Sequence, residues 1–223
     1  MLDLPLQHLY RPAAMGAAGA GEAWLLVLMH GVGSNEQDLF GLADYLPAHF
    51  HVLSLRAPIT LGPHSYGWFQ FGLRPDGGRI IDEAQEQASR ELIEQTCVAA
   101  GQQLQVPPAR TVLGGFSQGG IMALSLLLTR PALLQAAMVW HGRLLPEMLA
   151  QQAAPAELQG HGLWVSHGTQ DDVIPLAMAH RVRDHVQPLP LALNYREYPC
   201  RHELHPQELR DSVLWLKSLA GTY

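Results

Sequence analysis

The segment Gly115-Phe116-Ser117-Gln118-Gly119 has the residue types and spacing of a nucleophile elbow. Apolar runs flank it and predict a strand over Thr111 to Gly114 and a helix over Gln118 to Thr129. A sharp turn from strand to helix presents a serine hydroxyl at the sheet edge, provided that the flanking residues lack a bulky Cβ. The pattern therefore predicts Ser117 as a nucleophile, although a glycine-rich turn containing a serine would match the same five positions.

A serine hydroxyl needs a base to remove its proton, and the base needs an acid to orient it. For this type of elbow the expected chain order is serine, acid, histidine. Asp171 and Asp172 follow the apolar run Leu163 to Ser166, so they leave the carboxyl end of an expected strand. Spacing alone does not separate the two aspartates.

Two histidines compete for the role of base. Both His202 and His205 lie between the expected strand Leu191 to Tyr198 and the expected helix Pro206 to Leu219. We favour His202, while position alone leaves His205 open. The 12 histidines are scattered, with no His-x-x-x-His pair on one helical face and no Cys-x-x-Cys, so we predict no structural metal site.

Two backbone amides are expected to bind the oxyanion that forms when an ester is attacked. The Gln118 N–H opens the helix after Ser117 and has no partner within that helix. The second donor is expected in the turn His30-Gly31-Val32-Gly33, which directly follows the apolar run Trp24 to Met29. Our candidate is the Val32 N–H, and the alternative is a tight turn that uses glycine only for its backbone freedom.

These residues resemble the phospholipase/carboxylesterase family of serine hydrolases, relatives of the acyl-protein thioesterases, and most closely its compact bacterial esterases. The resemblance covers nearly the whole chain. It is carried by His30-Gly31-Val32-Gly33, Ala57-Pro58 with Gly67-Trp68-Phe69, Gly115 to Gly120, His167-Gly168-Thr169-Gln170-Asp171 and Tyr198-Pro199-Cys200-Arg201-His202-Glu203. It implies an α/β-hydrolase fold with Ser117 as nucleophile, Asp171 as acid and His202 as base, and it implies no cofactor.

The chain departs from the family pattern at three places. Arg201 stands where glycine is usual before the histidine, and Asp172 stands where proline is usual after the acid. Trp140-His141-Gly142-Arg143 replaces a common Ser-Gly. We expect His141, with Arg143, to stand near the mouth of the site and contact a polar or acidic substrate group; a surface-loop contact is the simpler interpretation of both.

The segment Ile59 to Ile80 is rich in glycine, proline and aromatic residues and is the candidate wall of an acyl-binding site. Trp68 and Phe69 would supply its apolar surface. The alternative is that these rings pack inward, and for Trp68 we favour it.

Length and pattern predict one α/β domain over residues 1–223, and the resemblance implies that it is an α/β-hydrolase domain. Expected strands alternate with expected helices, including Gln37 to Leu46, Asp82 to Leu104 and Pro175 to Val186, so the sheet should be mostly parallel and covered on both faces. Between Trp140 and Leu163 there is room for a short connection but not for a lid of several helices.

Charge and composition argue against several other classes of protein. The net charge of −6 disfavours nucleic-acid binding, and the single lysine, Lys217, excludes a polybasic membrane patch. No apolar run approaches the ~18 residues of a membrane span, and the acidic start does not resemble a signal peptide, so we expect a cytoplasmic protein without stable membrane insertion. Two cysteines, Cys97 and Cys200, fit that compartment.

The predicted activity is hydrolysis of a small-molecule ester or thioester through an acyl-enzyme. A lysophospholipase or an acyl-protein thioesterase would share this chemistry and differ in pocket depth. A non-catalytic interaction protein with the same fold is a further alternative, and the sequence leaves open a homodimer.

Overall fold

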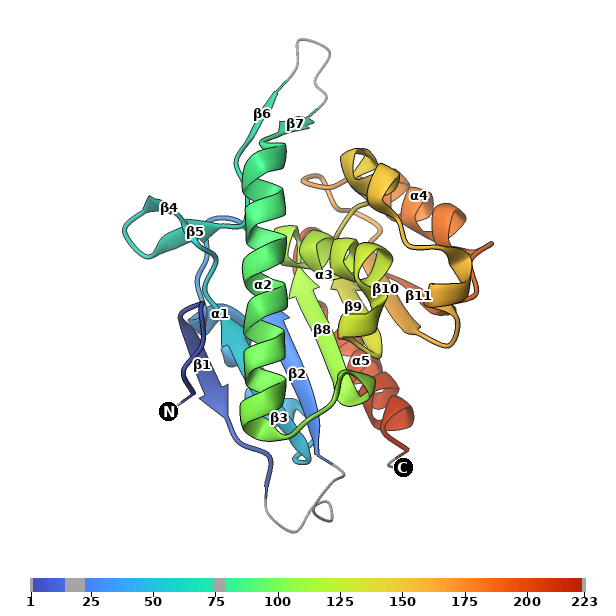
Figure 1. The fold of residues 1–223 in the computed structure, drawn as a ribbon. Coiled ribbons are helices and arrows are strands. Elements are labelled where there is room, and N and C mark those ends of the chain that lie inside the picture. The colour runs from blue at the N-terminus through green and yellow to red at the C-terminus, as the bar shows by residue number, and fades with distance from the viewer. Residues whose placement is uncertain (1, 15–22, 74–78, 222–223) are drawn as a thin grey trace.

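The computed structural model describes residues 2–14, 23–73 and 79–221. Its centre is a seven-stranded sheet with the order β1-β3-β2-β8-β9-β10-β11 (Figure 1). These strands are β1 (His8–Arg11), β2 (Trp24–Met29), β3 (Phe50–Leu55), β8 (Thr111–Phe116), β9 (Ala136–Trp140), β10 (Gly162–Gly168) and β11 (Ala192–Tyr198). Neighbouring strands are parallel except for the antiparallel pair of β1 and β3. The predicted mostly parallel sheet is therefore confirmed.

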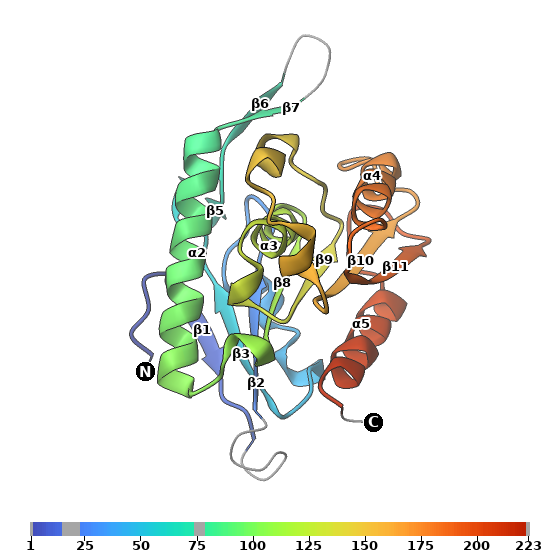
Figure 2. The same ribbon diagram turned by 45° about the vertical axis from the view of Figure 1, so that its right-hand side comes forward.

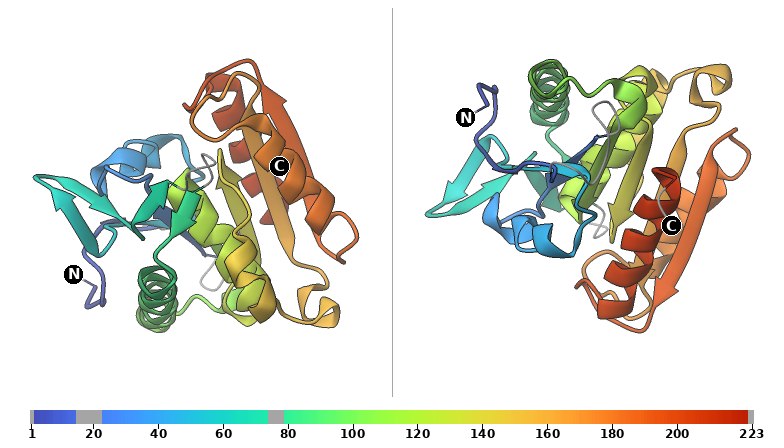
Figure 3. Two further views of the ribbon diagram at one scale, coloured as in Figure 1. Left: turned by 90° about the horizontal axis from the view of Figure 1, so that it is seen from above. Right: turned by 90° about the horizontal axis from the view of Figure 1, so that it is seen from below.

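Helices cover both faces of this sheet (Figure 3). They are α1 (Gln37–Phe40), α2 (Glu83–Leu104), α3 (Gln118–Thr129), α4 (Leu176–Val186) and α5 (Pro206–Leu219). One core holds Leu25 and Val27 with residues of α2, α3 and α4, and the other holds Leu26 and Leu28 with residues of α1 and α5. Successive side chains of β2 thus enter opposite cores, which explains why its sequence is apolar without a break.

Two parts of the chain differ from the expected elements. The helix expected over Gln37 to Leu46 is divided, because α1 ends before Gly41 and a separate 3₁₀ turn, η1 (Ala43–Tyr45), follows. The segment expected as the wall of an acyl-binding site, for which the sequence predicted no strands, forms two antiparallel pairs, β4 (Ile59–Gly62) with β5 (Ser65–Gly67) and β6 (Phe71–Leu73) with β7 (Arg79–Ile81). Residues 74–78 of that segment lie outside the described residues.

Short 3₁₀ helices make most of the remaining connections. They are η2 (Pro108–Arg110), η3 (Pro131–Leu133), η4 (Pro146–Gln151) and η5 (Pro155–Leu158). Each begins with proline, whose fixed φ suits a first helical position. Among the described residues, no helix combines the length and apolarity needed to cross a membrane.

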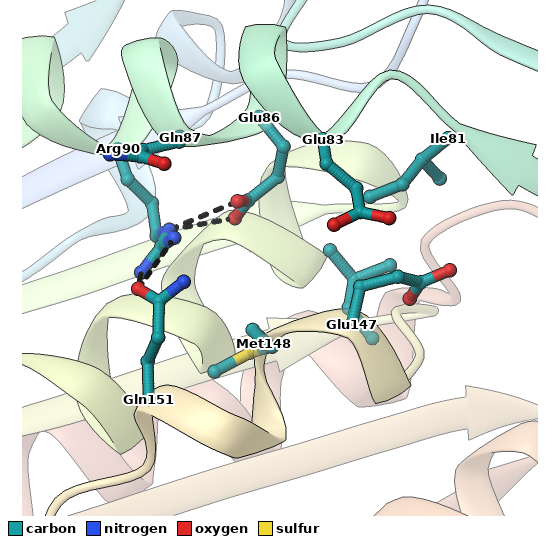
Figure 4. Close-up of a pocket in the computed structure, with 9 residues that line it drawn as sticks. Ile81, Glu83, Glu86, Gln87, Arg90, Glu147, Met148 and Gln151 are labelled. Carbon is teal, nitrogen blue, oxygen red and sulfur yellow. Dashed lines mark hydrogen bonds and ion pairs between the residues drawn. The ribbon is translucent and has the colours of Figure 1, made fainter.

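Helix α2 joins the β6–β7 pair to the body of the protein (Figure 2). Asp82 caps its first turn, where the carboxylate accepts the Gln85 N–H at 3.0 Å. Further along, the buried Arg90 is paired with Glu86 at 2.9 Å and also donates to Gln151 of η4 (Figure 4). These contacts hold α2 against the connection that follows β9.

Glu86→Gln is expected to lower the free energy of unfolding by about 3 kcal/mol, because it leaves the guanidinium of Arg90 buried without a counter-charge. Glu83→Gln is the matched control, since Glu83 lies one turn away on the same helix and is exposed. Urea unfolding of both variants measures the difference. Equal stability of the two variants would show that the buried ion pair contributes little.

Candidate functional site

Four sequence-predicted segments meet at the carboxyl edge of the sheet. Ser117 follows β8, Asp171 follows β10, His202 follows β11, and Val32 follows β2. Because these strands are parallel, their carboxyl ends share one edge. The arrangement makes a common site from residues far apart in the sequence.

Ser117 sits on the sharp turn between β8 and α3. Its backbone has φ 53° and ψ −115°, a region that residues with a Cβ rarely occupy. The Ser117 N–H donates to the Trp140 carbonyl at 2.8 Å, and the Ser117 carbonyl accepts the Ile121 N–H at 3.0 Å. These two bonds tie the strained turn to β9 and to α3, so the hydroxyl is held in one place.

The glycines on either side of Ser117 are required by close backbone approach. A Cβ on Gly119 would lie 1.9 Å from the Met29 carbonyl oxygen, and one on Gly115 would lie 2.4 Å from the Gly119 carbonyl oxygen. Both obstacles are backbone atoms, which cannot rotate away. The predicted need for small flanking residues therefore has a structural cause.

Gly119→Ala is expected to destabilise the protein by at least about 3 kcal/mol, because the end of β2 or the start of α3 must move to admit the methyl group. Gly41→Ala is the control, since a Cβ there meets nothing closer than 3.4 Å and the residue has φ −58°. Denaturant unfolding compares the two. A Gly119→Ala protein as stable as the control would contradict the close approach of β2 and α3.

Ser117, His202 and Asp171 form a continuous chain of hydrogen bonds. His202 Nε2 lies 2.9 Å from Ser117 Oγ, and His202 Nδ1 lies 2.7 Å from Asp171 Oδ2. The second oxygen of Asp171 accepts the N–H groups of Val173 and Ile174 at 2.9 and 2.8 Å. With Oδ1 fixed by the backbone, Oδ2 is directed to the imidazole.

The pKa of Asp171 reflects these contacts. Burial alone would raise it, but hydrogen bonds from His202, His141 and the Ile174 N–H outweigh burial and hold the pKa below its usual value. The carboxylate is therefore ionised at neutral pH and able to stabilise a protonated imidazole.

The structure distinguishes between the two aspartates that could be the acid and the two histidines that could be the base. Asp172 is exposed and pairs with Arg201, away from the imidazole of His202. The ring of His205 caps α5, where Nδ1 accepts the Gln207 N–H at 3.2 Å, and it stacks on Tyr198. Asp171 and His202 are thus the pair that the fold brings to Ser117.

The two residues whose amides are expected to bind an oxyanion line the same pocket as Ser117. Val32 and Gln118 line it together with Phe69, Phe71, Ile121, Arg143 and Ile174, and it spans about 290 Å³. Within the described residues, neither the Val32 N–H nor the Gln118 N–H donates to a protein acceptor. Both donors are therefore available to an oxygen bound next to Ser117 Oγ.

Comparison with known proteins identifies the family to which this geometry belongs. The model of the family described as Phospholipase/Carboxylesterase matches residues 13–219. The chain belongs to this family. A probable carboxylesterase of Oryza sativa subsp. japonica is 26% identical over 219 residues, covering 91% of this chain and 91% of the relative.

Solved structures of esterases share the fold. The Bacillus cereus carboxylesterase superposes with a TM-score of 0.80 at 22% identity, covering 96% of this chain and 94% of that chain. Esterase PE8 gives a TM-score of 0.78 at 26% identity, with 96% and 99% covered. The chain thus has an α/β-hydrolase fold, and as a member of the phospholipase/carboxylesterase family it is a serine hydrolase that acts on esters.

Two side chains that the sequence interpretation left without a role bond to backbone near the site. His30 is buried, its Nδ1 bonds to the Gly31 carbonyl at 2.7 Å, and its Nε2 accepts the Ala57 N–H at 3.1 Å. Burial lowers the pKa of His30, which keeps the ring neutral and able to accept. The side chain of Gln118 bonds to the backbone of Trp68 and Phe69 at 2.7 and 2.6 Å. For this role of His30, the only signal in the sequence is its position next to a glycine-containing turn.

The two aromatic residues proposed as substrate contacts lie in different environments in the structure. Phe69 lines the pocket beside Ser117. Trp68 has no exposed surface, and its Nε1–H donates to the His30 carbonyl at 2.9 Å. The assignment of Trp68 as a substrate contact is therefore wrong, and the favoured alternative of inward packing holds, because its ring fills the space beneath the turn after β2.

The placement of His141 at the mouth of the site is also wrong. Its side chain is fully buried, and its two ring nitrogens face Asp171 at 3.0 Å and Glu208 at 3.3 Å. Arg143, two residues later, does line the pocket. The turn after β9 directs His141 inward, which residue type alone does not indicate.

Two groups of described side chains are close enough together to hold a metal ion. One is His141, Asp171 and His202, and the other is His141, Cys200 and Glu208. Hydrogen bonds already join His141 to Asp171 and Glu208, and His202 to Asp171. These bonds account for the clustering, so we assign no metal to it.

Proposed function

We propose that the protein is a carboxylesterase in which Ser117, His202 and Asp171 act as a catalytic triad. The observation that carries this proposal is the unbroken hydrogen-bonded chain from Ser117 Oγ through the imidazole to Asp171, built on a strained elbow. In this mechanism His202 Nε2 takes the proton of Ser117 as Oγ attacks the ester carbonyl. Asp171 holds the ring and stabilises its charged form.

The Val32 and Gln118 amides bind the oxyanion of the tetrahedral intermediate in this proposal. His202 then protonates the leaving alcohol, and an acyl group remains bonded to Ser117. Water, deprotonated by the same imidazole, attacks the acyl-enzyme and releases the acid. No cofactor is needed, because the serine, the imidazole and the two amides supply every proton and charge in the sequence.

We propose that the acyl group is short. Support comes from the small size of the apolar pocket beside Ser117, whose space of about 290 Å³ includes a part that is open to solvent. Arg143, which also lines this pocket, would contact a polar part of the substrate.

A long-chain substrate is the second candidate, as in a lysophospholipase or an acyl-protein thioesterase. One observation favours it: Phe71, on the β6–β7 pair, lines the pocket and is also 41% exposed, so the apolar surface continues from the pocket to the outside of the protein. Exposed apolar groups of this kind would contact the far end of a long chain.

Two measurements test these proposals. A fluorophosphonate probe should add once to the protein, and the mass increase should map to the peptide that contains Ser117. A series of p-nitrophenyl esters of increasing acyl length, run beside acyl-thioesters, should give its highest kcat/KM for short esters. Failure of Ser117 to react would contradict the triad and favour a non-catalytic interaction protein, whereas a rise in kcat/KM with length would favour the long-chain candidate.

We propose a cytoplasmic location. Its support is that Cys97 and Cys200 are free and buried, as expected of a protein from a reducing compartment. Burial raises the pKa of Cys97 to about 12 and that of Cys200 to about 11, so both are unreactive thiols at neutral pH. Cell fractionation with an antibody to the protein tests the location.

A further inference from the structure

His141 lies between two carboxylates that come from different parts of the fold. Its Nδ1 is 3.0 Å from Asp171 Oδ2, and its Nε2 is 3.3 Å from Glu208 Oε2. The side chains of all three residues have no exposed surface. The backbone of His141 has φ 53°, a left-handed conformation that costs energy for most residues. The fold therefore holds this imidazole in place despite local strain.

The contacts of His141 with Asp171 and Glu208 require a certain number of protons on these three groups. Ionised carboxylates only accept hydrogen bonds, and a neutral imidazole has one N–H to donate. For both ring nitrogens of His141 to donate, the ring must carry an additional proton. Otherwise the proton must lie on Asp171 or on Glu208.

Each carboxylate has other donors that favour its ionised form. Asp171 accepts the N–H groups of Val173 and Ile174 and the Nδ1–H of His202. Glu208 lies in the first turn of α5 and accepts the His205 N–H at 3.1 Å. The shared proton therefore belongs on His141. In agreement, burial opposes the charge, but the bonds and charges of Glu208 and Asp171 outweigh it and raise the pKa of His141.

The other titratable groups around His141 are neutral or variable in charge. His167 stacks on the ring at 5.1 Å, and burial lowers its pKa. Cys200 has an atom within 4.8 Å of the cluster, and burial raises the pKa of this thiol. The ring of His202 stands edge-on at 5.6 Å. Phe116 closes the remaining side at 5.4 Å between centroids.

We propose that His141 is a buried imidazolium, held by Glu208, that positions Asp171 and shares the charge of Asp171 Oδ2 with His202. The inference rests on the proposed triad and deepens it, because His141 and Glu208 act through Asp171 and do not touch substrate. Both histidines bond to the same oxygen, at 2.7 Å for His202 and 3.0 Å for His141.

The cation at His141 affects when His202 gains a proton. A positive charge beside Asp171 offsets part of the attraction of the carboxylate for a second positive charge on His202. The two rings therefore compete for the charge of one oxygen, Asp171 Oδ2. Removing the charge of His141 should make protonation of His202 easier.

His141→Asn is the variant that tests this effect, because asparagine is neutral and tolerates the left-handed backbone. The acid limb of the kcat/KM profile should move to higher pH by about one unit. The double variant His141→Asn, Glu208→Gln removes one charge of each sign, so its acid limb should return toward that of the wild type. A loss of activity without any shift of the limb, or the same shift in both variants, would overturn the proposal.

His180→Asn is the matched control, since His180 also bonds to a carboxylate, Glu197 at 2.9 Å, but on the surface. Its profile should equal that of the wild type.

NMR of histidine-labelled wild-type protein gives a readout that does not require activity. At about pH 8, above the usual pKa of histidine, the signal lost in His141→Asn should show both ring nitrogens protonated. If His141→Asn does not fold, Glu208→Gln identifies the signal by its shift. A neutral ring would overturn the inference even in an active esterase, whereas an inactive wild type would contradict only the proposed function.

Discussion

Ser117→Ala is expected to lower kcat for p-nitrophenyl acetate by about 10⁶-fold. The reason is that the imidazole of His202, 2.9 Å from Ser117 Oγ, loses the hydroxyl that it activates. The Val32 and Gln118 amides remain, so the variant should keep a small rate above that of water. Steady-state and burst-phase kinetics measure both, and the acyl-enzyme burst should vanish.

Ser218→Ala provides the control for this substitution, because Ser218 is exposed on α5, outside the site. It should hydrolyse the ester at the wild-type rate. If Ser117→Ala kept more than about one thousandth of kcat, another nucleophile or a directly activated water would have to carry the reaction. The stability of Ser117→Ala should not fall, since alanine fits where the small hydroxyl was.

The fold was predictable where burial leaves a pattern in the sequence. A parallel strand covered on both faces must be apolar throughout, and the unbroken run of β2 follows from that requirement. The end of each such strand then marks the sheet edge where polar residues collect. For this reason the positions of Ser117, Asp171 and Val32 at one edge could be inferred before any coordinates.

Other features depend on packing that a single sequence does not encode. His141 and Glu208 are 67 residues apart and meet only because the fold brings the turn after β9 to the first turn of α5. The inward direction of Trp68 depends on an acceptor, the His30 carbonyl, that belongs to another strand end. Residue type showed that these side chains can bond, but not with which partner.

Asp171→Asn is expected to lower kcat/KM by about 10⁴-fold, as the equivalent change does in serine proteases. Asp171 Oδ1 accepts two backbone N–H groups, so the amide oxygen of asparagine must take that position. The amide nitrogen then occupies the place of Oδ2 and presents N–H donors to His202 and His141. His202 can bond to it only through an unprotonated Nδ1, which puts the ring proton on Nε2. That tautomer cannot take the proton of Ser117.

Asp172→Asn makes the same chemical change one residue away and serves as the control. Asp172 is exposed and its partner is Arg201, so the kcat/KM of this variant should stay near the wild-type value. The asparagine in Asp171→Asn also turns an N–H donor toward His141, so the ring of His141 should lose its extra proton. The NMR signal of His141 should therefore change in Asp171→Asn but not in Asp172→Asn. Equal losses of activity in the two variants would mean that the acid does not set the tautomer of His202. A large loss in Asp171→Asn with an unchanged His141 signal would separate the triad from the proposed imidazolium.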